Sequence, residues 1–338
     1  MATFLGDINT RARGLRTRLL QPNELDRLAH APNLFALQRD LSAHGFTRPD
    51  APATTDVLEQ AIRRHAAAQI AVLSRWSEGP RRTALAVLFE DEDQRSIQAI
   101  VRGAEQSAPA NARLAGLVPT ASLPERALQA LAAQPTVRDV IHLLGWLQHP
   151  LAAPLLEPAS KPHPSLFQIE VALHRGFASR AKKNARNGDR NLSAYVAQVI
   201  DIMNVWSVLL HFDERDPSIV DLTFVDGGSA LPRAAFEQLM SLQRLGDVEE
   251  MLVNQFRGSP LSSPFGRSID SPPELESAIL RAQIDWQNRS LRADPSGTAP
   301  IIGFALELRA QVISLRRIVW GVALRAPPTL LFPGLEMA

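Results

Sequence analysis

The sequence predicts an all-α protein in which one helical unit occurs three times. Apolar residues recur three and four positions apart along most of the chain, for example within 85–89 and 97–101, which places them on one face of a helix. Alternating apolar and polar residues, which indicate strands, are rare. The best candidate, Val220–Val225, runs into a Gly-rich turn and is predicted to be a connector. Two short motifs repeat every ~110 residues and so predict a repeated unit.

The first motif is an aliphatic residue, Glu, any residue, Ala, an aliphatic residue, any residue and Arg. Its three glutamates are Glu59, Glu170 and Glu276. Each copy follows a possible capping box, in which a short oxygen side chain accepts from first-turn amides and an acid or amide three residues later binds back. The three boxes are Asp56 with Glu59, Ser165 with Gln168, and Ser271 with Glu274. All three copies are therefore predicted to begin helices, the last with Pro272 in its first turn.

A second motif follows 31 to 35 residues after each of these glutamates. It pairs an Asp with a Ser or Asn three residues later, at the head of an apolar run. The copies are Asp93 with Ser96, Asp201 with Asn204, and a weaker third copy that begins at Gln311 and includes Ser314 and Arg316. A buried polar group without a partner costs about 1–3 kcal/mol. We therefore expect these side chains to cap helices or to bind a neighbouring repeat.

A third element, Leu-Pro at the start of an apolar helix, occurs at 123–124 and again at 231–232, an offset of 108 residues. Ser122 and Glu125 form a further possible capping box at the first copy. Near the N-terminus, residues 20–22 resemble the element imperfectly. The predicted division is residues 51–157, 158–267 and 268–338 for the three helical repeats, with N-terminal helices in residues 1–50 that pack on the third repeat.

Composition favours a globular protein with no nucleic-acid partner. Of 338 residues, 45% are hydrophobic, and 36 basic side chains balance 35 acidic ones to leave a net charge of +1. The one basic stretch, Arg180–Arg190, is predicted to be a solvated loop, or alternatively a docking contact for an acidic partner or a membrane surface. The apolar window 195–212 carries Asp201 and Asn204 near its middle, so we expect a buried helix rather than a membrane span.

The familiar sequence patterns of catalysis are missing. The chain has no cysteine, no glycine-rich phosphate loop, no G-x-S-x-G turn and no H-E-x-x-H helix. We predict no catalytic residue, no cofactor and no metal site. The protein is therefore not expected to be an enzyme.

The run of four acids from Glu90 to Asp93 is the strongest alternative to this view. Two carboxylates three apart on a helix can share a magnesium ion bound to a diphosphate, and Glu90 and Asp93 have that spacing. No second acidic motif follows downstream, however, and Asp93 already belongs to the second repeated motif. The sequence thus favours a structural role for the acids over a metal site.

Several segments together resemble the central-stalk subunit, called C or d, of V-type and archaeal-type rotary ATPases. The resemblance covers nearly the whole chain, and it depends on the order of short helical patterns rather than on any one of them. The segments are Asn9–Arg13 followed by Leu19 and Leu20, Leu85–Arg102, Tyr195–Leu210, Phe224–Gly228, and Arg316–Trp320.

The resemblance implies an all-helical funnel of three similar lobes about a pseudo-threefold axis, with a central socket. It further implies a non-catalytic rotor subunit that receives the shaft of D- and F-type subunits, rests on the membrane rotor ring and transmits torque. Such a protein would be cytoplasmic and peripheral to the inner membrane. The alternative is a divergent helical scaffold that shares this fold outside a rotary ATPase.

One position departs from the family pattern. Members commonly carry a glutamate shortly before the last Arg-x-Ile-x-Trp stretch, where this chain offers Gln311, Val312 and Ser314. Either another residue of this chain makes the contact that the family's glutamate makes, or this protein is a divergent relative with a different partner. As candidate partner contacts we consider the arginines of the first helix and the two lysines of the basic stretch: Arg11, Arg13, Arg16, Lys182 and Lys183.

Overall fold

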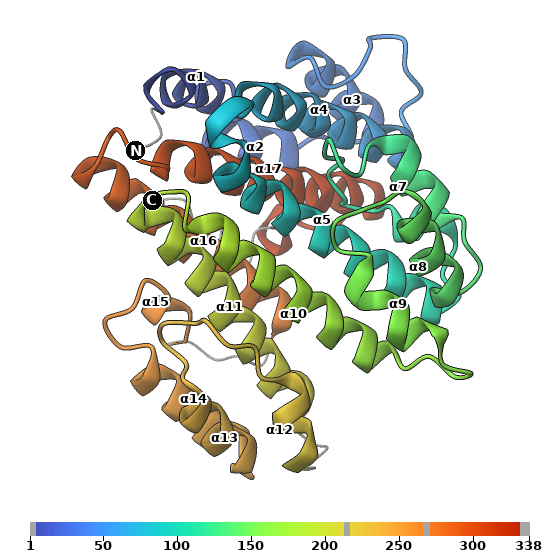
Figure 1. Ribbon diagram of the computed structural model, residues 1–338. Helices are drawn as coiled ribbons and strands as arrows, with labels where there is room; N and C mark the ends of the chain where they lie inside the picture. Colours follow the sequence, from blue (N-terminus) through green and yellow to red (C-terminus); the bar gives the residue numbers. More distant parts are fainter. Residues whose placement is uncertain (1–4, 213–216, 266–270, 332–338) are drawn as a thin grey trace.

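Helices are the only regular secondary structure in the residues that the computed structural model describes, 5–212, 217–265 and 271–331 (Figure 1). The predicted fold class, all-α, is confirmed, because this part of the chain contains 17 α-helices, two short 3₁₀ helices and no strand. The α-helices are α1 (Gly6–Arg16), α2 (Pro22–Ala29), α3 (Leu34–Ala43), α4 (Thr55–Trp76), α5 (Arg82–Glu105), α6 (Ala110–Arg113), α7 (Glu125–Ala132), α8 (Val137–Trp146), α9 (Ala153–Ser160), α10 (Leu166–Ala185), α11 (Arg190–Leu210), α12 (Pro217–Thr223), α13 (Arg233–Ser241), α14 (Leu245–Gln255), α15 (Ser262–Phe265), α16 (Pro272–Ala293) and α17 (Ala299–Leu324).

Each of the three repeated glutamates is the fifth residue of a long helix, but the predicted caps are only partly correct. Ser165 caps α10, since its hydroxyl accepts from the backbone N–H of Gln168 at 3.5 Å. At α4 the cap is Thr54, two residues before the predicted Asp56. Ser271 precedes α16 as predicted, yet its side chain makes no capping hydrogen bond.

Three other local predictions are wrong. Ser122 does not cap α7, because its hydroxyl donates instead to Asp93 and the helix begins after Pro124. Part of the predicted connector 220–225 is helical, since α12 extends to Thr223. The basic stretch 180–190 is mostly the last turns of α10 rather than a loop.

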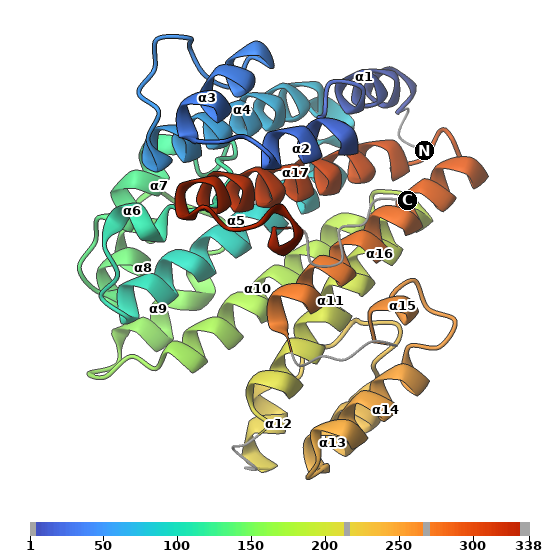
Figure 2. The same ribbon diagram turned by 180° about the vertical axis from the view of Figure 1, so that it is seen from behind.

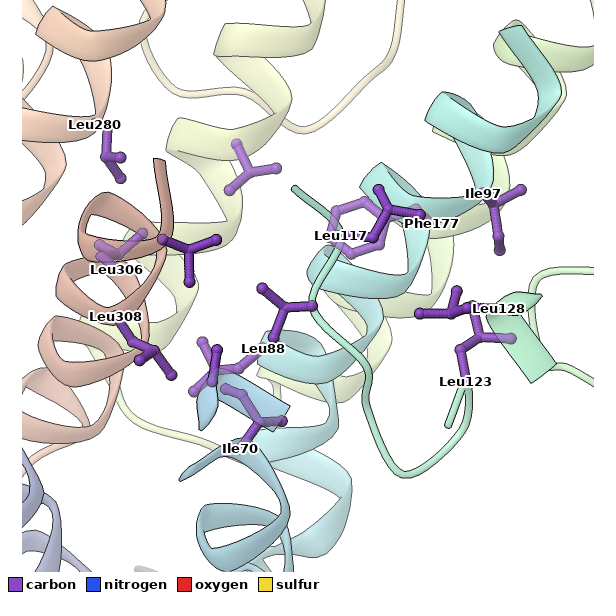
Figure 3. Close-up of a cluster of buried hydrophobic side chains, with 14 of the residues drawn as sticks. Ile70, Leu88, Ile97, Leu117, Leu123, Leu128, Phe177, Leu280, Leu306 and Leu308 are labelled. Atoms are coloured by element: carbon purple, nitrogen blue, oxygen red, sulfur yellow. The ribbon is translucent and has the colours of Figure 1, made fainter. Parts of the chain in front are cut away.

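Buried hydrophobic side chains form two clusters. The larger one joins α1–α5, α7–α11 and α17 with Leu280 of α16, and Figure 3 shows side chains of α4, α5, α7, α10, α16 and α17 gathered in part of it. The smaller one joins one face of α11 to α13, α14, α15 and α16. Both ribbon views place α12–α15 at one end of the molecule, away from α1–α4 (Figures 1 and 2). The helices α11 and α16 therefore connect the two clusters.

The longest helix, α17, is buried on most of its sides. It packs against α1, α2 and α3 from the N-terminal part of the chain, and also against α4 and α16 (Figure 2). Its apolar residues surround the helix rather than forming one stripe, which is typical of a helix enclosed by neighbours. The division into residues 1–50 and three repeats, and their arrangement about a pseudo-threefold axis, stay predictions.

A buried ion cluster links the long helices α5, α11 and α17. The guanidinium of Arg309 on α17 donates to Asp91 Oδ2 on α5 at 2.7 Å and to Glu92 Oε2 at 2.8 Å. The hydroxyl of Tyr195 on α11 donates to the same Asp91 oxygen at 2.8 Å. Asp91 and Tyr195 are almost fully buried. One carboxylate therefore connects three helices that are far apart in the sequence.

The surroundings of Asp91 keep it ionised. Burial by itself would raise its pKa, but the positive charges of Arg95 and Arg309 and the hydrogen bonds from Arg309 and Tyr195 outweigh burial. The pKa of Asp91 is lowered to about 2. Burial and the neighbouring carboxylate raise the pKa of Tyr195, so that its hydroxyl stays a donor.

One helix of the described residues, α11, is long and apolar enough to cross a membrane. In this fold 72% of its most apolar window is buried among other helices. Asp201 and Asn204, near its middle, are buried as well. The burial agrees with the predicted buried helix.

Replacing Arg309 with Ala should lower the free energy of unfolding by about 3–5 kcal/mol, because the substitution removes the cation that binds both buried Asp91 and half-buried Glu92. Urea unfolding followed by circular dichroism measures the loss. Arg126→Ala is the matched control, since Arg126 is exposed on α7 and surface substitutions change stability by about 0.5 kcal/mol or less. Equal losses in the two variants would contradict this role for Arg309.

The stabilisation that ionised Asp91 provides should disappear in acid. Because folding lowers the pKa of Asp91 to about 2, from about 3.9 in an unfolded chain, its contribution is complete above about pH 5 and is lost as the pH falls from 4 to 2. The difference in unfolding free energy between the wild type and Asp91→Asn should shrink by about 2 kcal/mol over that range. Unfolding titrations at a series of pH values test this, and a pH-independent difference would refute it.

Candidate functional site

Two of the three repeated glutamates bind the end of a neighbouring long helix. Glu59 on α4 accepts from Arg316 Nε at 2.8 Å and from the indole N–H of Trp320 at 2.9 Å, both on α17. Glu170 on α10 accepts two hydrogen bonds from the guanidinium of Arg102 near the end of α5, one of them at 2.9 Å. Arg102 stands nine residues after Asp93 in its helix, and Trp320 stands nine after Gln311. The donors to Glu59 and Glu170 therefore include residues at matching positions, nine residues after the start of the second motif.

The third glutamate, Glu276 on α16, differs from the other two. At the matching positions α11 carries Trp206 and Leu210, and neither side chain donates a hydrogen bond to Glu276. Within the described residues Glu276 makes no hydrogen bond or ion pair, although its charge acts on Arg317: burial lowers the pKa of Arg317 and Glu276 partly opposes that effect. Leu210 is 57% exposed. Glu276 thus lacks the side-chain partner on the neighbouring helix that Glu59 and Glu170 have.

Trp206, Leu210 and Glu276 line a pocket of about 370 Å³ between α5, α10, α11 and α16. Apolar side chains of α10 and α11 form much of its wall, and the bound pair of Arg102 and Glu170 lies at its edge. His174, also in the wall, is neutral at pH 7, because burial lowers its pKa to about 4 despite the opposing charge of Glu170. The pocket offers an apolar surface with one carboxylate that no side chain of the described chain neutralises directly. Such a surface suits binding of a protein side chain rather than catalysis.

The second repeated motif binds the loop before a short helix. Asp201 on α11 accepts from the backbone N–H groups of Ser229, Ala230 and Leu231 at 2.9–3.0 Å, directly before α13. Burial raises the pKa of Asp201, while these hydrogen bonds act in the opposite direction. Asn204, one turn later, binds both the N–H and the C=O of Val225 at 2.9 Å.

Asp93 holds the equivalent loop of the first predicted repeat. Its carboxylate accepts from the hydroxyls of Thr120 and Ser122, just before α7, and lies 3.1 Å from Nε2 of His149. Asp93 is fully buried, and so is Ser96 three residues later.

Gln311 makes the corresponding contact on α17, with a segment from the other end of the chain. Its side-chain oxygen accepts from the backbone N–H of Leu20 at 2.6 Å, directly before α2. The residues at 20–22 are those that resemble the Leu-Pro element in the sequence. An amide therefore makes, at this third position, the contact that carboxylates make at the other two.

The acidic pair proposed as a metal site in the alternative interpretation is engaged in other contacts. Glu90 binds the guanidinium of Arg180 on α10 at 2.6 and 3.2 Å, and Asp93 holds the loop before α7. Within the described ranges no three acidic or histidine side chains are placed to hold a metal ion. The geometry thus gives Glu90 and Asp93 structural partners.

The candidate partner contacts lie in two separate places. On α1, Arg11 lies over the ring of Trp76 at 5.1 Å, Arg13 donates to the C=O of Pro295 at 2.9 Å, and Arg16 forms an ion pair with Glu307 and binds Asn288. On α10, Lys182 binds Asp226 at 2.9 Å and Lys183 is exposed. Arg16 is therefore used in joining α1 to α17. A role of the five residues in partner binding stays a prediction.

Replacing Gln311 with Leu should cost about 1–3 kcal/mol of stability, because the buried N–H of Leu20 loses its acceptor. The loss should be local, so hydrogen exchange should accelerate at the Leu20 amide and in α2 before it does so elsewhere. Gln238→Leu, on the exposed side of α13, is the matched control. Unchanged exchange at Leu20 in Gln311→Leu would show that the contact does not hold the N-terminal segment.

Comparison with known proteins identifies the family of this chain. The chain is 25% identical over 322 residues to the C subunit of the V-type ATP synthase of Deinococcus radiodurans, covering 92% of this chain and 85% of the relative. It is 24% identical over 279 residues to the C subunit of the A-type ATP synthase of Halobacterium salinarum, covering 79% and 77%. The model of the ATP synthase (C/AC39) subunit family matches residues 8–331. The chain belongs to the ATP synthase (C/AC39) subunit family.

Proposed function

We propose that this protein is the non-catalytic central-stalk subunit of a V/A-type rotary ATPase. In that role it joins the shaft of D- and F-type subunits to the membrane rotor ring and transmits torque for ATP-driven or ATP-producing ion transport. The relatives' names and the family match over residues 8–331 support the assignment to such a complex. The protein would be cytoplasmic and attached to the inner membrane through the ring.

The observation that carries the mechanical part of the proposal is the buried cluster of Asp91, Tyr195 and Arg309. A coupling subunit must keep its shape while its partners exert force in different directions. One buried carboxylate bound by side chains of two other helices resists their separation, because breaking either hydrogen bond leaves a charge or a polar group unpaired in the interior. Ionisable groups that are bound in this way serve rigidity rather than a reaction.

The pocket beside Glu276 is the proposed place for the end of the shaft. Two of three matched contacts are closed by an arginine or a tryptophan of this chain, and the third presents Trp206, Leu210 and Glu276 instead. A cationic side chain of a partner could complete the contact with Glu276, while apolar neighbours cover the indole of Trp206. Tryptophan is enriched among the residues that dominate protein interfaces.

Replacing Leu210 with Asp should abolish association with the shaft. The new carboxylate would lose its hydration on burial against an apolar side chain of the partner, which is costly. Tagged protein purified from native membranes at low salt should recover D-type, F-type and ring subunits, and Leu210→Asp should lose the D- and F-type subunits. Leu147→Asp, just after α8, is the control, since Leu147 is 43% exposed and lies outside the pocket.

The outcomes separate the candidate functions. Loss of the shaft subunits with Leu147→Asp as well would show that the pocket is not the specific contact. If the wild-type protein recovers no rotary ATPase subunit, the coupling function is wrong and the divergent scaffold of this fold is favoured.

A further inference from the structure

A second cleft, about 860 Å³ in volume, lies on the opposite side of α10 from its contacts with α5. It is bounded by α10, the segment 224–226 and the start of α13. Ala178 and Val225, both nearly buried, and half-buried Phe224 form its floor. Five cationic side chains stand around this floor: Arg175, Lys182, Lys183, Arg186 and Arg233. We call this set the basic cleft.

Three of the five cations are held in place by this chain. Arg175 donates to the C=O of Asp221 at 2.6 Å. Lys182 binds both the C=O and the carboxylate of Asp226, at 2.7 and 2.9 Å. Arg233 forms ion pairs with Asp221 and Glu237. The carboxylate of Asp226, which lines the cleft, and those of Asp221 and Glu237 are therefore already bound to its cations.

Lys183 and Arg186 have no such partner in the part of the chain that the structure describes. Both are exposed, and they stand three residues apart near the end of α10, which places them on one face of the helix. The chain as a whole is nearly balanced in charge, with a net charge of +1. Two exposed cations that no carboxylate of the described chain neutralises therefore stand together at the basic cleft.

We infer that the basic cleft binds an acidic segment of a partner protein, with two carboxylates on Lys183 and Arg186 and an apolar side chain on the floor at Phe224. The three cations that this chain already binds provide a positive field without having to be ordered on binding. Lys183 and Arg186 provide the direct contacts. An apolar floor of this size matches a peptide side chain better than it matches a free phosphate, which has no apolar surface to bury. The cleft is open, as the approach of a chain segment requires.

This inference extends the proposed function by a second interface, whose lining residues are distinct from those of the pocket at Glu276. It does not depend on which partner binds that pocket. In a subunit that connects two partners, two separate surfaces of different chemistry would allow both to remain attached at once.

The experiment measures binding of a labelled dodecapeptide of glutamates with one central phenylalanine to the full-length protein by fluorescence anisotropy. Binding should weaken as salt is raised, since the contacts are between exposed charges. Lys183→Glu combined with Arg186→Glu should weaken binding at least about tenfold, because each reversal removes an attraction and adds a repulsion. The control is Arg289→Glu combined with Arg292→Glu on α16, outside the cleft, which should leave binding unchanged.

Circular dichroism of each variant establishes that it is folded. Peptide binding that is insensitive to the Lys183 and Arg186 reversals overturns the inference. So does a result in which inorganic phosphate, or vesicles of phosphatidylcholine with phosphatidylglycerol, bind at this cleft while the peptide does not. Peptide binding that depends on the two residues supports the inference even if membrane purification recovers no rotary ATPase subunit, so the two proposals fail separately.

Discussion

The contact between Arg309 and Asp91 is the constraint on which the arrangement of the long helices depends. The two residues lie 218 positions apart in the chain, and both are removed from solvent. Removing charges from water is costly, so such a pair is stable only when its geometry is good and its remaining hydrogen-bonding groups are satisfied. Tyr195 donates a second hydrogen bond to Asp91 Oδ2 from a third helix. A packing of α5, α11 and α17 that separates any of the three residues would leave a buried charge unpaired, and the cluster therefore selects one arrangement among many apolar ones.

The same constraint explains why four acids stand in a row on a buried helix. Successive residues of an α-helix point about 100° apart, so the four carboxylates face different neighbours. Glu90 faces α10 and binds Arg180, whereas Asp91 and Glu92 face α17 and share Arg309. Asp93 faces the loop before α7. The run indicates a helix surrounded on several sides rather than a site that gathers negative charge on one ligand.

The sequence is sufficient for the fold class and for the recurring polar positions, and insufficient for their partners. Helical periodicity is local, so it identifies the long helices, and the repeated spacing identifies Glu59, Glu170, Asp93 and Asp201 as positions with a shared role. The partner of a buried charge depends on tertiary packing. Nothing near Arg309 in the sequence distinguishes it from a surface arginine except that it interrupts the apolar residues of α17. His149 likewise reaches Asp93 only through the fold. The cap of α4 is ambiguous in the sequence because Thr, Thr and Asp stand together at 54–56, and each residue type is a good cap.

The differences between the predicted repeats are more informative about function than their similarities. If all three glutamates were needed only to hold the fold, a donor would be expected opposite each of them. Arg316 and Trp320 fulfil that requirement for Glu59, and Arg102 fulfils it for Glu170. Opposite Glu276, α11 presents a tryptophan that makes no hydrogen bond to this glutamate and a leucine whose side chain is mostly exposed. An exposed apolar residue beside an unbound carboxylate gives up stability that the other two positions retain. Such a loss of stability is reasonable where another molecule completes the interaction, so we propose that the partner binds at the third position rather than at the two closed ones.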